Sequence, residues 1–319
     1  MNVAFFDEEA IDAALDFKLL VAELKTAFAG SFTVPVRHHH TIDHAGKAEA
    51  THLLMPAWTD GAAPETLGVK IVNVFPDNGK TGLPSIQGIY VLMSGETGVP
   101  LAVMDGARLT AWRTAAASAL AASFLAAPDS RHLLMVGTGA LSPFVIRAHA
   151  SVRPIDSVTI WGRDPDKARN IADELDEDAF AVGITEDLEQ AVGEADIVSC
   201  ATLSQTPLVH GAWLKPGAHL DLIGAFRPNM RESDDEAVAR ARLFVDTRDG
   251  ALKEGGDIVI PLAQGVITAD KVEADLFDLC RGTVAVQRAP RDITLFKSTG
   301  TAIEDLAAAA LVWRKSGLG

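Results

Sequence analysis

The sequence is short of cysteine, of positive charge and of long apolar runs, and each shortage excludes a class of protein. Its two cysteines, Cys200 and Cys280, fit neither a metal-ligand spacing nor a disulfide framework, as expected in a reducing compartment. Only 28 lysines and arginines face 43 acidic residues, and the net charge of −15 disfavours nucleic acid and anionic membranes as partners. A small anionic substrate is still compatible with this charge if cations gather locally.

No stretch reaches the roughly 18 consecutive apolar residues of a membrane helix. The first residues, MNVAFFDEEAIDAAL, lack the basic and apolar parts of a secretion signal, so we expect a cytoplasmic protein. A chain of 319 residues that is 48% hydrophobic is long enough for two domains with separate cores.

The apolar pattern changes character along the chain. From Arg131 onward, short β-branched runs alternate with helical stretches (HLLMVG, SPFVIRAHASV, SVTIWG, DPDKARNIADEL), which predicts a doubly wound parallel sheet. Before that point, LGVKIVNVF and IQGIYVLMS are separated by turn signals, which predicts a mostly antiparallel sheet. The alanine-rich stretch LTAWRTAAASALAASFLAA is expected to form a helix between them. The C-terminal TAIEDLAAAALVWRK has a capping-box spacing, Thr301 to Glu304, and is expected to pack back on the first domain.

A glycine-rich turn indicates a dinucleotide site. The run Gly137-Thr138-Gly139-Ala140-Leu141-Ser142 follows the apolar LLMV and precedes a predicted helix with Pro143 in its first turn. Gly137 would permit the tight turn, and Gly139 would let the backbone approach a pyrophosphate at the helix N-terminus. Ser142 replaces the usual third glycine, so an ordinary tight turn remains the alternative.

The choice of cofactor is read at the end of the next strand, SVTIW, which leads into Gly162-Arg163-Asp164. A basic side chain at this point suits the 2′-phosphate of NADP, and an acidic one suits the ribose hydroxyl of NAD. Arg163 favours NADPH, and Asp164 keeps NADH open. Arg163 as a solvated loop cation is the alternative.

Three cations are candidates for binding a substrate carboxylate. Lys70 interrupts the apolar run LGVKIVNVF, in a strand expected to be covered on both faces, where an unpaired ammonium is costly. Arg113 is expected in the first turn of its helix, where the macrodipole disfavours a cation without a nearby anion. Arg37, in the extended segment TVPVRHHHTI, is the third. A structural ion pair for Lys70 and simple exposure for Arg37 are the alternatives.

Three consecutive histidines, His38, His39 and His40, suggest a metal, but neighbouring strand residues point to opposite faces, so only His38 and His40 would share a ligand. No matching carboxylate spacing accompanies them. We predict no metal site, and a histidine contribution to the substrate pocket is the open alternative.

Several motifs together resemble the ornithine cyclodeaminase and mu-crystallin family over nearly the whole chain. They are LMPAW (54–58), VKIVNVFPDN (69–78), GLPSIQG (82–88), TGVPLAVMDGARLTAWRTAAASA (97–119), VGTGA (136–140), RPNMRESDDE (227–236) and FKSTGTAIEDLA (296–307). The resemblance implies a homodimer whose substrate-binding and dimerisation domain, residues 1–118 and 300–319, is mixed α+β. A Rossmann dinucleotide-binding domain, residues 119–299, is inserted into it.

The resemblance also implies roles for individual residues. It assigns Arg37, Lys70 and Arg113 to recognition of the substrate carboxylate, in agreement with the argument from charge. Residues expected near the cofactor are Ser85, Arg113, Thr202, Phe226, Lys297 and Ser298, besides the turn from Gly137 to Ser142 and Gly162 to Asp164.

One departure from the family pattern bears on the reaction. Ornithine cyclodeaminases carry an aspartate where this chain has Phe226, and a phenyl ring neither accepts nor donates a proton. The RPNMRE form instead resembles reductases of Δ1-pyrroline-2-carboxylate and Δ1-piperideine-2-carboxylate. We therefore expect NAD(P)H-dependent reduction of the C=N bond of a cyclic imino acid to L-proline or L-pipecolate, in proline metabolism, with Lys70 as a candidate proton donor.

Three other functions stay open. A cyclodeaminase-type lyase acting on ornithine follows from the family but conflicts with Phe226. An amino-acid dehydrogenase or N-alkyl amino-acid synthase shares the cations and the cofactor but needs a free amine and a keto acid. A non-enzymatic ligand-binding role, as in some mu-crystallins, fits less well with an intact cofactor turn.

Overall fold

The protein is described by a computed structural model that covers residues 3–61 and 66–318. The chain divides into two compact units, one formed by the residues up to Arg113 together with those from Thr301, the other by Thr114–Gly300. Within the described residues, no helix is long and apolar enough to cross a membrane.

The first unit is built on a seven-stranded sheet with the order β1-β7-β6-β5-β4-β2, and β3 pairs with the other part of β4. All pairs are antiparallel except β1 with β7, which confirms the expected mostly antiparallel sheet. The strands are β1 (Ala4–Phe6), β2 (Phe32–Thr33), β3 (His38–Ile42), β4 (Ala50–Thr59), β5 (Thr66–Val74), β6 (Ile86–Ser94) and β7 (Pro100–Asp105).

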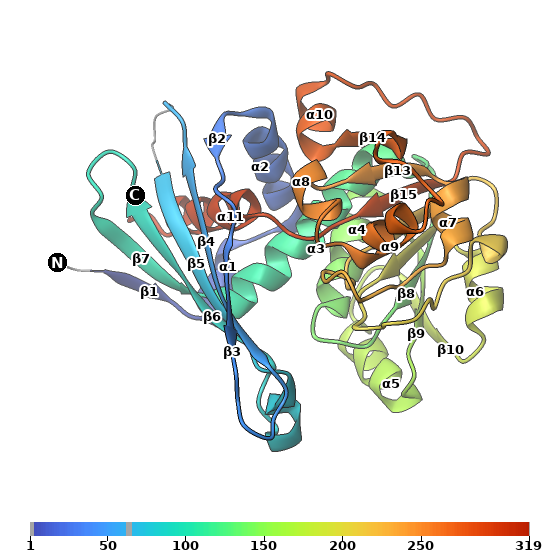
Figure 1. The fold of residues 1–319 in the computed structure, drawn as a ribbon, viewed down its shortest axis with the longest axis horizontal. Helices are drawn as coiled ribbons and strands as arrows, with labels where there is room; N and C mark the ends of the chain where they lie inside the picture. The colour runs from blue at the N-terminus through green and yellow to red at the C-terminus, as the bar shows by residue number, and fades with distance from the viewer. Residues whose placement is uncertain (1–2, 62–65, 319) are drawn as a thin grey trace. The chain divides into compact units, whose positions relative to one another are not determined.

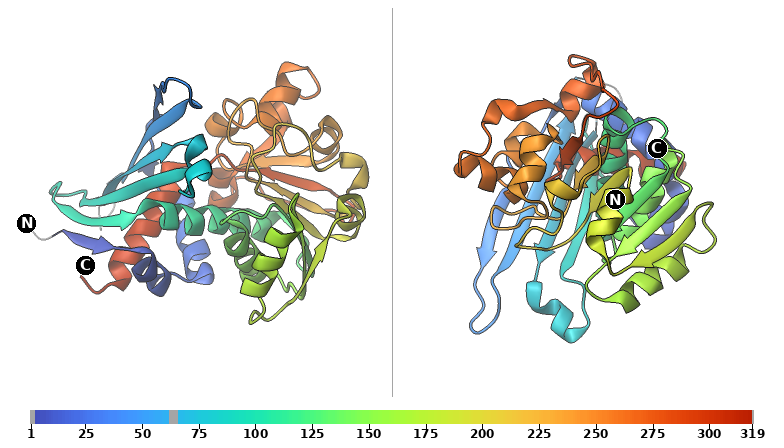
Figure 2. Two further views of the ribbon diagram at one scale, coloured as in Figure 1. Left: turned by 90° about the horizontal axis from the view of Figure 1, so that it is seen from below. Right: turned by 90° about the vertical axis from the view of Figure 1, so that its right-hand side faces the viewer.

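Helices cover one face of this sheet. Helix α11 (Ala302–Lys315, red in Figures 1 and 2) lies against β4, β5 and β6 and against α2 (Phe17–Ala29), which confirms that the C-terminal helix returns to the first unit. Helix α1 (Glu8–Ala14) also contacts α11, and the short helix η1 (Pro76–Thr81) lies between β5 and β6. The predicted capping box is wrong, because Thr301 makes no side-chain cap hydrogen bond.

The expectation that β5 is covered on both faces is also wrong. Gly68, Lys70 and Val72 are buried, whereas the alternate residues Val69 and Ile71 are half-buried. Because strand residues alternate between faces, one face of the sheet is covered by helices and the other is only partly covered within a single chain.

Helix α3 (Gly106–Leu125) begins three residues before the predicted stretch, directly after β7, and the division between the units falls within it. Arg113 is therefore the eighth helical residue and lies beyond the first turn. The macrodipole argument for an anion at Arg113 is wrong, because the effect fades within the first turn.

The second unit contains an eight-stranded parallel sheet with the order β10-β9-β8-β11-β12-β15-β13-β14, which confirms the predicted Rossmann type. The strands are β8 (His132–Val136), β9 (Ser157–Trp161), β10 (Ala181–Thr185), β11 (Ile197–Cys200), β12 (His219–Leu222), β13 (Arg242–Val245), β14 (Val272–Asp275) and β15 (Thr294–Lys297). The order reverses between β8 and β11, and such a switch point is where open α/β sheets bind ligands.

The connections of this unit are mostly helical. They are α4 (Ser142–Val152), α5 (Pro165–Glu174), α6 (Leu188–Glu194), η2 (Gly211–Trp213), α7 (Asp235–Arg240), α8 (Arg248–Ala251), α9 (Gly256–Ala263), η3 (Ala269–Lys271) and α10 (Leu276–Arg281). Asp164 and Asp187 cap α5 and α6 with their carboxylates, which fixes where these helices begin.

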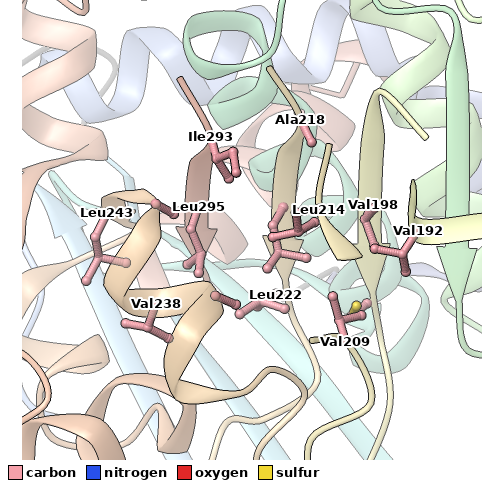
Figure 3. Packing of buried hydrophobic residues seen from close by; sticks show 14 of the residues in the cluster. Val192, Val198, Val209, Leu214, Ala218, Leu222, Val238, Leu243, Ile293 and Leu295 are labelled. Atoms are coloured by element: carbon pink, nitrogen blue, oxygen red, sulfur yellow. The ribbon is translucent and has the colours of Figure 1, made fainter. Parts of the chain in front are cut away.

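The two faces of the parallel sheet have cores of different character. On one face, Val198, Leu222, Leu243 and Leu295 from four strands pack together with Val238 of α7 (Figure 3). These side chains form an apolar core of the kind expected for a sheet covered by helices on both faces.

The opposite face contains a buried polar network. Asp221 of β12 accepts hydrogen bonds from Ser118 of α3 and Ser199 of β11 and lies 3.2 Å from Nε2 of His149 on α4. These partners lower the pKa of the Asp221 carboxyl despite its complete burial, which by itself raises it.

Candidate active site

The turn after β8 has the geometry of a phosphate-binding loop. Gly137 has φ +129°, and a Cβ there would lie 2.7 Å from the carbonyl oxygen of Ala201, so only glycine fits. A Cβ at Gly139 would meet no atom within 4 Å, so the surface above this glycine is open. The turn leads into α4, whose N-terminal N–H groups favour an anion, so these residues fit a dinucleotide pyrophosphate.

Ser142 closes this turn. Its hydroxyl donates a 3.0 Å hydrogen bond to the carbonyl oxygen of Gly137, and its side chain is fully buried. The serine thus ties the start of the turn to the first residue of the helix, and Pro143 follows in the first turn as predicted. Thr138 and Leu141 are half-buried and Ala140 is exposed.

Of the two charged residues after β9, Asp164 makes a local hydrogen bond and Arg163 is exposed. The Asp164 carboxylate caps α5 by accepting from the backbone N–H of Asp166 at 3.1 Å. The Arg163 side chain is exposed to solvent. Gly162 permits close approach to Thr138, because a Cβ at this glycine would lie 2.4 Å from Cγ2 of that threonine. Arg163 is therefore placed at the end of the second Rossmann strand, beside the cofactor turn.

Lys70 and Arg113 come together in a buried cluster with two acids from the start of α11. Nζ of Lys70 lies 2.8 Å from Oδ2 of Asp305, and the Arg113 guanidinium donates to Asp305 at 3.0 Å and to Glu304 at 2.5 Å. All four side chains are at most 7% exposed. The alternative of a structural ion pair for Lys70 is thus confirmed, and both cations have protein carboxylates as partners.

Sequence reasoning missed Glu304 and Asp305 as site residues. The signal was present in the motif FKSTGTAIEDLA, where two consecutive acids precede a run of alanines, but Glu304 was assigned to capping Thr301. In the structure its carboxylate turns to Arg113 instead. The cluster has two positive and two negative charges, so it is neutral overall when all four groups are ionised.

Burial and the positive charge of Arg113 lower the pKa of the Lys70 ammonium against the opposing effect of Asp305, and the net result is a pKa of about 8. Lys70 can therefore hold and release a proton near neutral pH. Its neighbour in the sheet, Tyr90, is fully buried, and burial raises the pKa of this phenol well above its usual value.

Arg37 lies one residue before β3. The register pairs His38 with Leu54, and Met55 with Lys70, so extending it by one residue places Arg37 in the same cross-strand row as Met55 and Lys70. Two strand spacings separate the Arg37 and Lys70 backbones, roughly 10 Å. In this extended register the side chains of Arg37 and Lys70 would share one face of the sheet, and the long Arg37 side chain would span much of this distance.

The histidines follow the predicted alternation. The rings of His38 and His40 lie 6.3 Å apart, and His40 lies at the same distance from His52 of β4. Within residues 3–61 and 66–318, no group of three or more histidines, cysteines or acids has the arrangement of a metal site.

The remaining predicted cofactor residues lie in separate environments. Thr202 follows β11 and is half-buried, Phe226 is half-buried under the Arg227 guanidinium, and Ser85 is a half-buried residue before β6 in the first unit. Lys297 and Ser298, at the end of β15, are buried: Nζ of Lys297 points inward to Asp257 at 3.3 Å. The expected approach of Lys297 to the cofactor stays a prediction.

Taken together, the fold and these residues define a dinucleotide-binding protein whose first unit carries a buried cluster of cations and acids. The family model of the ornithine cyclodeaminase/mu-crystallin family matches residues 6–317, and the chain belongs to this family.

Relatives with stated activities share most of the chain. A Δ1-pyrroline-2-carboxylate reductase of Paracoccus denitrificans is 40% identical over 88% of this chain and 90% of its own length. The solved structure of the Thermococcus litoralis enzyme of the same name, in complex with NADH and L-proline, is 32% identical with a TM-score of 0.93 and covers 98% of this chain and 97% of its own. An archaeal alanine dehydrogenase dimer with bound NAD is 28% identical with a TM-score of 0.91, over 99% and 96% of the two chains.

Proposed function

We propose that this protein is an NAD(P)H-dependent reductase of the C=N bond of a cyclic imino acid. It would convert Δ1-pyrroline-2-carboxylate to L-proline and Δ1-piperideine-2-carboxylate to L-pipecolate. The observation that carries the proposal is the buried pair of Lys70 and Arg113, which offers cations for one carboxylate in a chain that also has a dinucleotide turn. The Thermococcus litoralis relative, solved with NADH and L-proline, supports the same chemistry.

The reaction requires a hydride at ring carbon C2 and a proton at the ring nitrogen. A bound reduced nicotinamide supplies the hydride. Arg113, Lys70 and Arg37 hold the carboxylate and thereby orient the planar ring, so that positioning provides most of the rate enhancement. Lys70, with a pKa of about 8, gives its proton to a neutral imine nitrogen; a ring that binds as the iminium already carries this proton.

For the cofactor, we propose NADPH as the preferred hydride donor, with NADH as the alternative. The support is the exposed Arg163 at the end of β9, together with the engagement of Asp164 in capping α5 rather than in presenting an acid to a ribose. The turn from Gly137 to Ser142 would hold the pyrophosphate.

We also propose a homodimer formed through the uncovered face of the first unit's sheet. This face carries half-buried and exposed apolar side chains from neighbouring strands, including Phe5 (68% exposed) and Ile89 (40% exposed) beside Val69, Val91 and Val103. An apolar face of this kind is typical of subunit interfaces. Sedimentation equilibrium tests the proposal against the chain mass of 33.7 kDa.

In this proposal residues 1–118 and 300–319 bind substrate and form the dimer, and residues 119–299 bind the dinucleotide. We propose a cytoplasmic location, which the scarcity of cysteine supports, since the chain has only two.

The test is to follow nicotinamide oxidation at 340 nm with each of the two cyclic imines, with NADPH and NADH in parallel. We expect turnover without added ammonia and a higher kcat/KM with NADPH. Ammonia release from ornithine with NAD, in the absence of imine reduction, would instead establish a cyclodeaminase.

A second candidate is an amino-acid dehydrogenase, favoured by the likeness to the archaeal alanine dehydrogenase. It is distinguished by strict dependence of 2-keto-acid reduction on ammonia. The cyclodeaminase candidate is disfavoured by the phenyl ring of Phe226, which offers no acid–base group.

A further inference from the structure

Glu232, in the loop between β12 and α7, has a fully buried carboxylate that joins two other loops. One oxygen accepts hydrogen bonds from the backbone N–H of Thr202 at 2.6 Å and from its hydroxyl at 2.8 Å. The other accepts from the backbone N–H groups of Gly224 at 2.7 Å and Ala225 at 3.3 Å. Thr202 follows β11 and Gly224 follows β12, so one side chain links the ends of two adjacent strands.

The backbones of these two loops are in close contact. A Cβ at Gly224 would lie 1.8 Å from the carbonyl oxygen of Thr202, so only glycine allows this approach. On its other side, the loop after β11 touches the cofactor turn, since a Cβ at Gly137 would lie 2.7 Å from the Ala201 carbonyl oxygen. The Glu232 carboxylate with its four hydrogen bonds to Thr202, Gly224 and Ala225 forms a joint between the two loops. This joint adjoins the switch point between β8 and β11.

Glu232 is itself held in place by a second buried acid. The backbone N–H groups of Glu232 and Ser233 donate to Oδ1 of Asp257 at 2.8 Å and 2.9 Å. The other oxygen of Asp257 lies 3.3 Å from Nζ of Lys297. Lys297 and Asp257 thus fix the main chain from which the Glu232 carboxylate reaches the two loops.

We propose that Glu232 is a positioning residue that fixes the loops after β11 and β12 where the nicotinamide end of the cofactor binds, without touching the cofactor. A dinucleotide with its pyrophosphate at the turn after β8 crosses the switch point, and its second half then lies over the ends of β11 and β12. The inference rests on the proposed function only in taking the cofactor to be a nicotinamide nucleotide.

The joint needs the ionised carboxylate, because all four of its partners donate. The groups facing Glu232 are Asp257 from α9, Lys297 from β15 and Cys200 from β11. Burial raises the pKa of Glu232, Lys297 opposes this and Asp257 adds to it, and the net result is a pKa of about 7. Protonation would place an O–H donor against an N–H donor, so cofactor binding should weaken as the pH falls through this range.

The size of the effect follows from the population of the ionised form. If only that form binds, the apparent Kd for NADPH rises about tenfold between pH 8 and pH 6. An adenine-side fragment such as 2′,5′-ADP does not reach these loops, so its Kd should not share this dependence.

The experiment measures Kd by fluorescence or calorimetric titration of NADPH, NADH and two adenine-side fragments, 2′,5′-ADP and 5′-ADP, with wild type and Glu232→Gln. The glutamine has the same shape but sets an NH2 group against two donors. We expect NADPH and NADH affinities to fall tenfold or more, their pH dependence to disappear, and fragment affinities to stay within twofold. Glu236→Gln, at a half-exposed glutamate of α7, is the matched control and should change nothing.

Equal loss of affinity for whole cofactors and fragments would overturn the proposal, and so would unchanged binding of all four. If Glu232→Gln does not fold, the pH dependence of Kd for the wild-type protein decides. A tenfold change in the Kd for NADPH between pH 8 and pH 6, with no change for the fragments, supports the proposal, and an equal change for NADPH and the fragments refutes it. Because these readouts are binding constants, a failure to reduce cyclic imines would overturn the proposed function and leave this inference standing.

Discussion

Replacing Asp305 by asparagine should move the pH profile of the enzyme. Asp305 is the acid shared by Lys70 and Arg113, with its oxygens 2.8 Å and 3.0 Å from their nitrogens. The asparagine keeps the shape and removes the charge. Burial and the charge of Arg113 lower the pKa of Lys70, Asp305 raises it, and the net value is about 8. The pKa must therefore fall when the Asp305 carboxylate is lost.

The magnitude follows from Coulomb's law. Two unit charges 4 Å apart attract by about 4 kcal/mol at an effective dielectric constant of 20, which corresponds to roughly three pKa units. Water entry and relaxation reduce this, so we expect the Lys70 pKa to fall by at least about one unit. Loss of one partner from a buried pair also costs about 3–5 kcal/mol of stability.

The assay is the pH dependence of kcat/KM for the cyclic imine, which reports groups of the free enzyme. If protonated Lys70 is needed, the basic limb of wild type lies near pH 8 and shifts to about pH 7 or below in Asp305→Asn. Glu304→Gln removes a partner of Arg113 and leaves the Lys70 pair intact, so its limb should shift much less. A folded Asp305→Asn enzyme with an unmoved limb would show that Lys70 is not the titrating group.

Two further predictions concern the second unit. Arg163→Ala should raise KM for NADPH about tenfold or more and leave KM for NADH unchanged, because a charge-assisted phosphate contact is worth about 1.5–3 kcal/mol; parallel changes for both cofactors would remove Arg163 from the 2′-phosphate. Burial lowers the pKa of His219 to about 3, so below pH 6.5 the unfolded state binds a proton at this histidine and the folded state does not. The free energy of unfolding is therefore unaffected by His219 above pH 6.5 and is lower by about 2 kcal/mol at pH 5. In His219→Gln, the change in unfolding free energy between pH 7 and pH 5 should be smaller by this amount; an identical change in both proteins would contradict the assignment.

The parallel sheet was predictable because its signals are local. HLLMV is buried on both faces and therefore reads as a continuous apolar strand, whereas SVTIW alternates buried and half-buried residues. Gly137 marks the turn that no other residue can make. The position of Arg113 was misjudged because α3 starts at Gly106, directly after β7. Asp105, the last residue of that strand, caps the helix by accepting from the backbone N–H of Arg108 at 2.7 Å, and this cap was not recognised in the sequence.

The charge partners were not predictable in the same way. Asp305 meets Lys70 across 235 positions of sequence, and periodicity carries no information about such pairs. Glu232 stood within the quoted motif RPNMRESDDE, but its partners Thr202 and Gly224 are set by the order of strands in the sheet. Local patterns identify which residues are costly to bury, and the topology decides which of them meet.

The neutral cluster also bears on substrate choice. Because Lys70 and Arg113 already have Glu304 and Asp305 as partners, a ligand with only a carboxylate adds net negative charge to a buried neutral group, which is costly. A ring that carries both a carboxylate and a positively charged nitrogen is neutral overall and offers each sign of the cluster a counterpart. We therefore expect L-proline to inhibit the forward reaction at least about tenfold more strongly than cyclopentanecarboxylate, which has the same ring size and no nitrogen, a difference of about 1.4 kcal/mol. Measured Ki values that are equal would show that the acids of the cluster serve only to hold the cations and take no part in selecting the substrate.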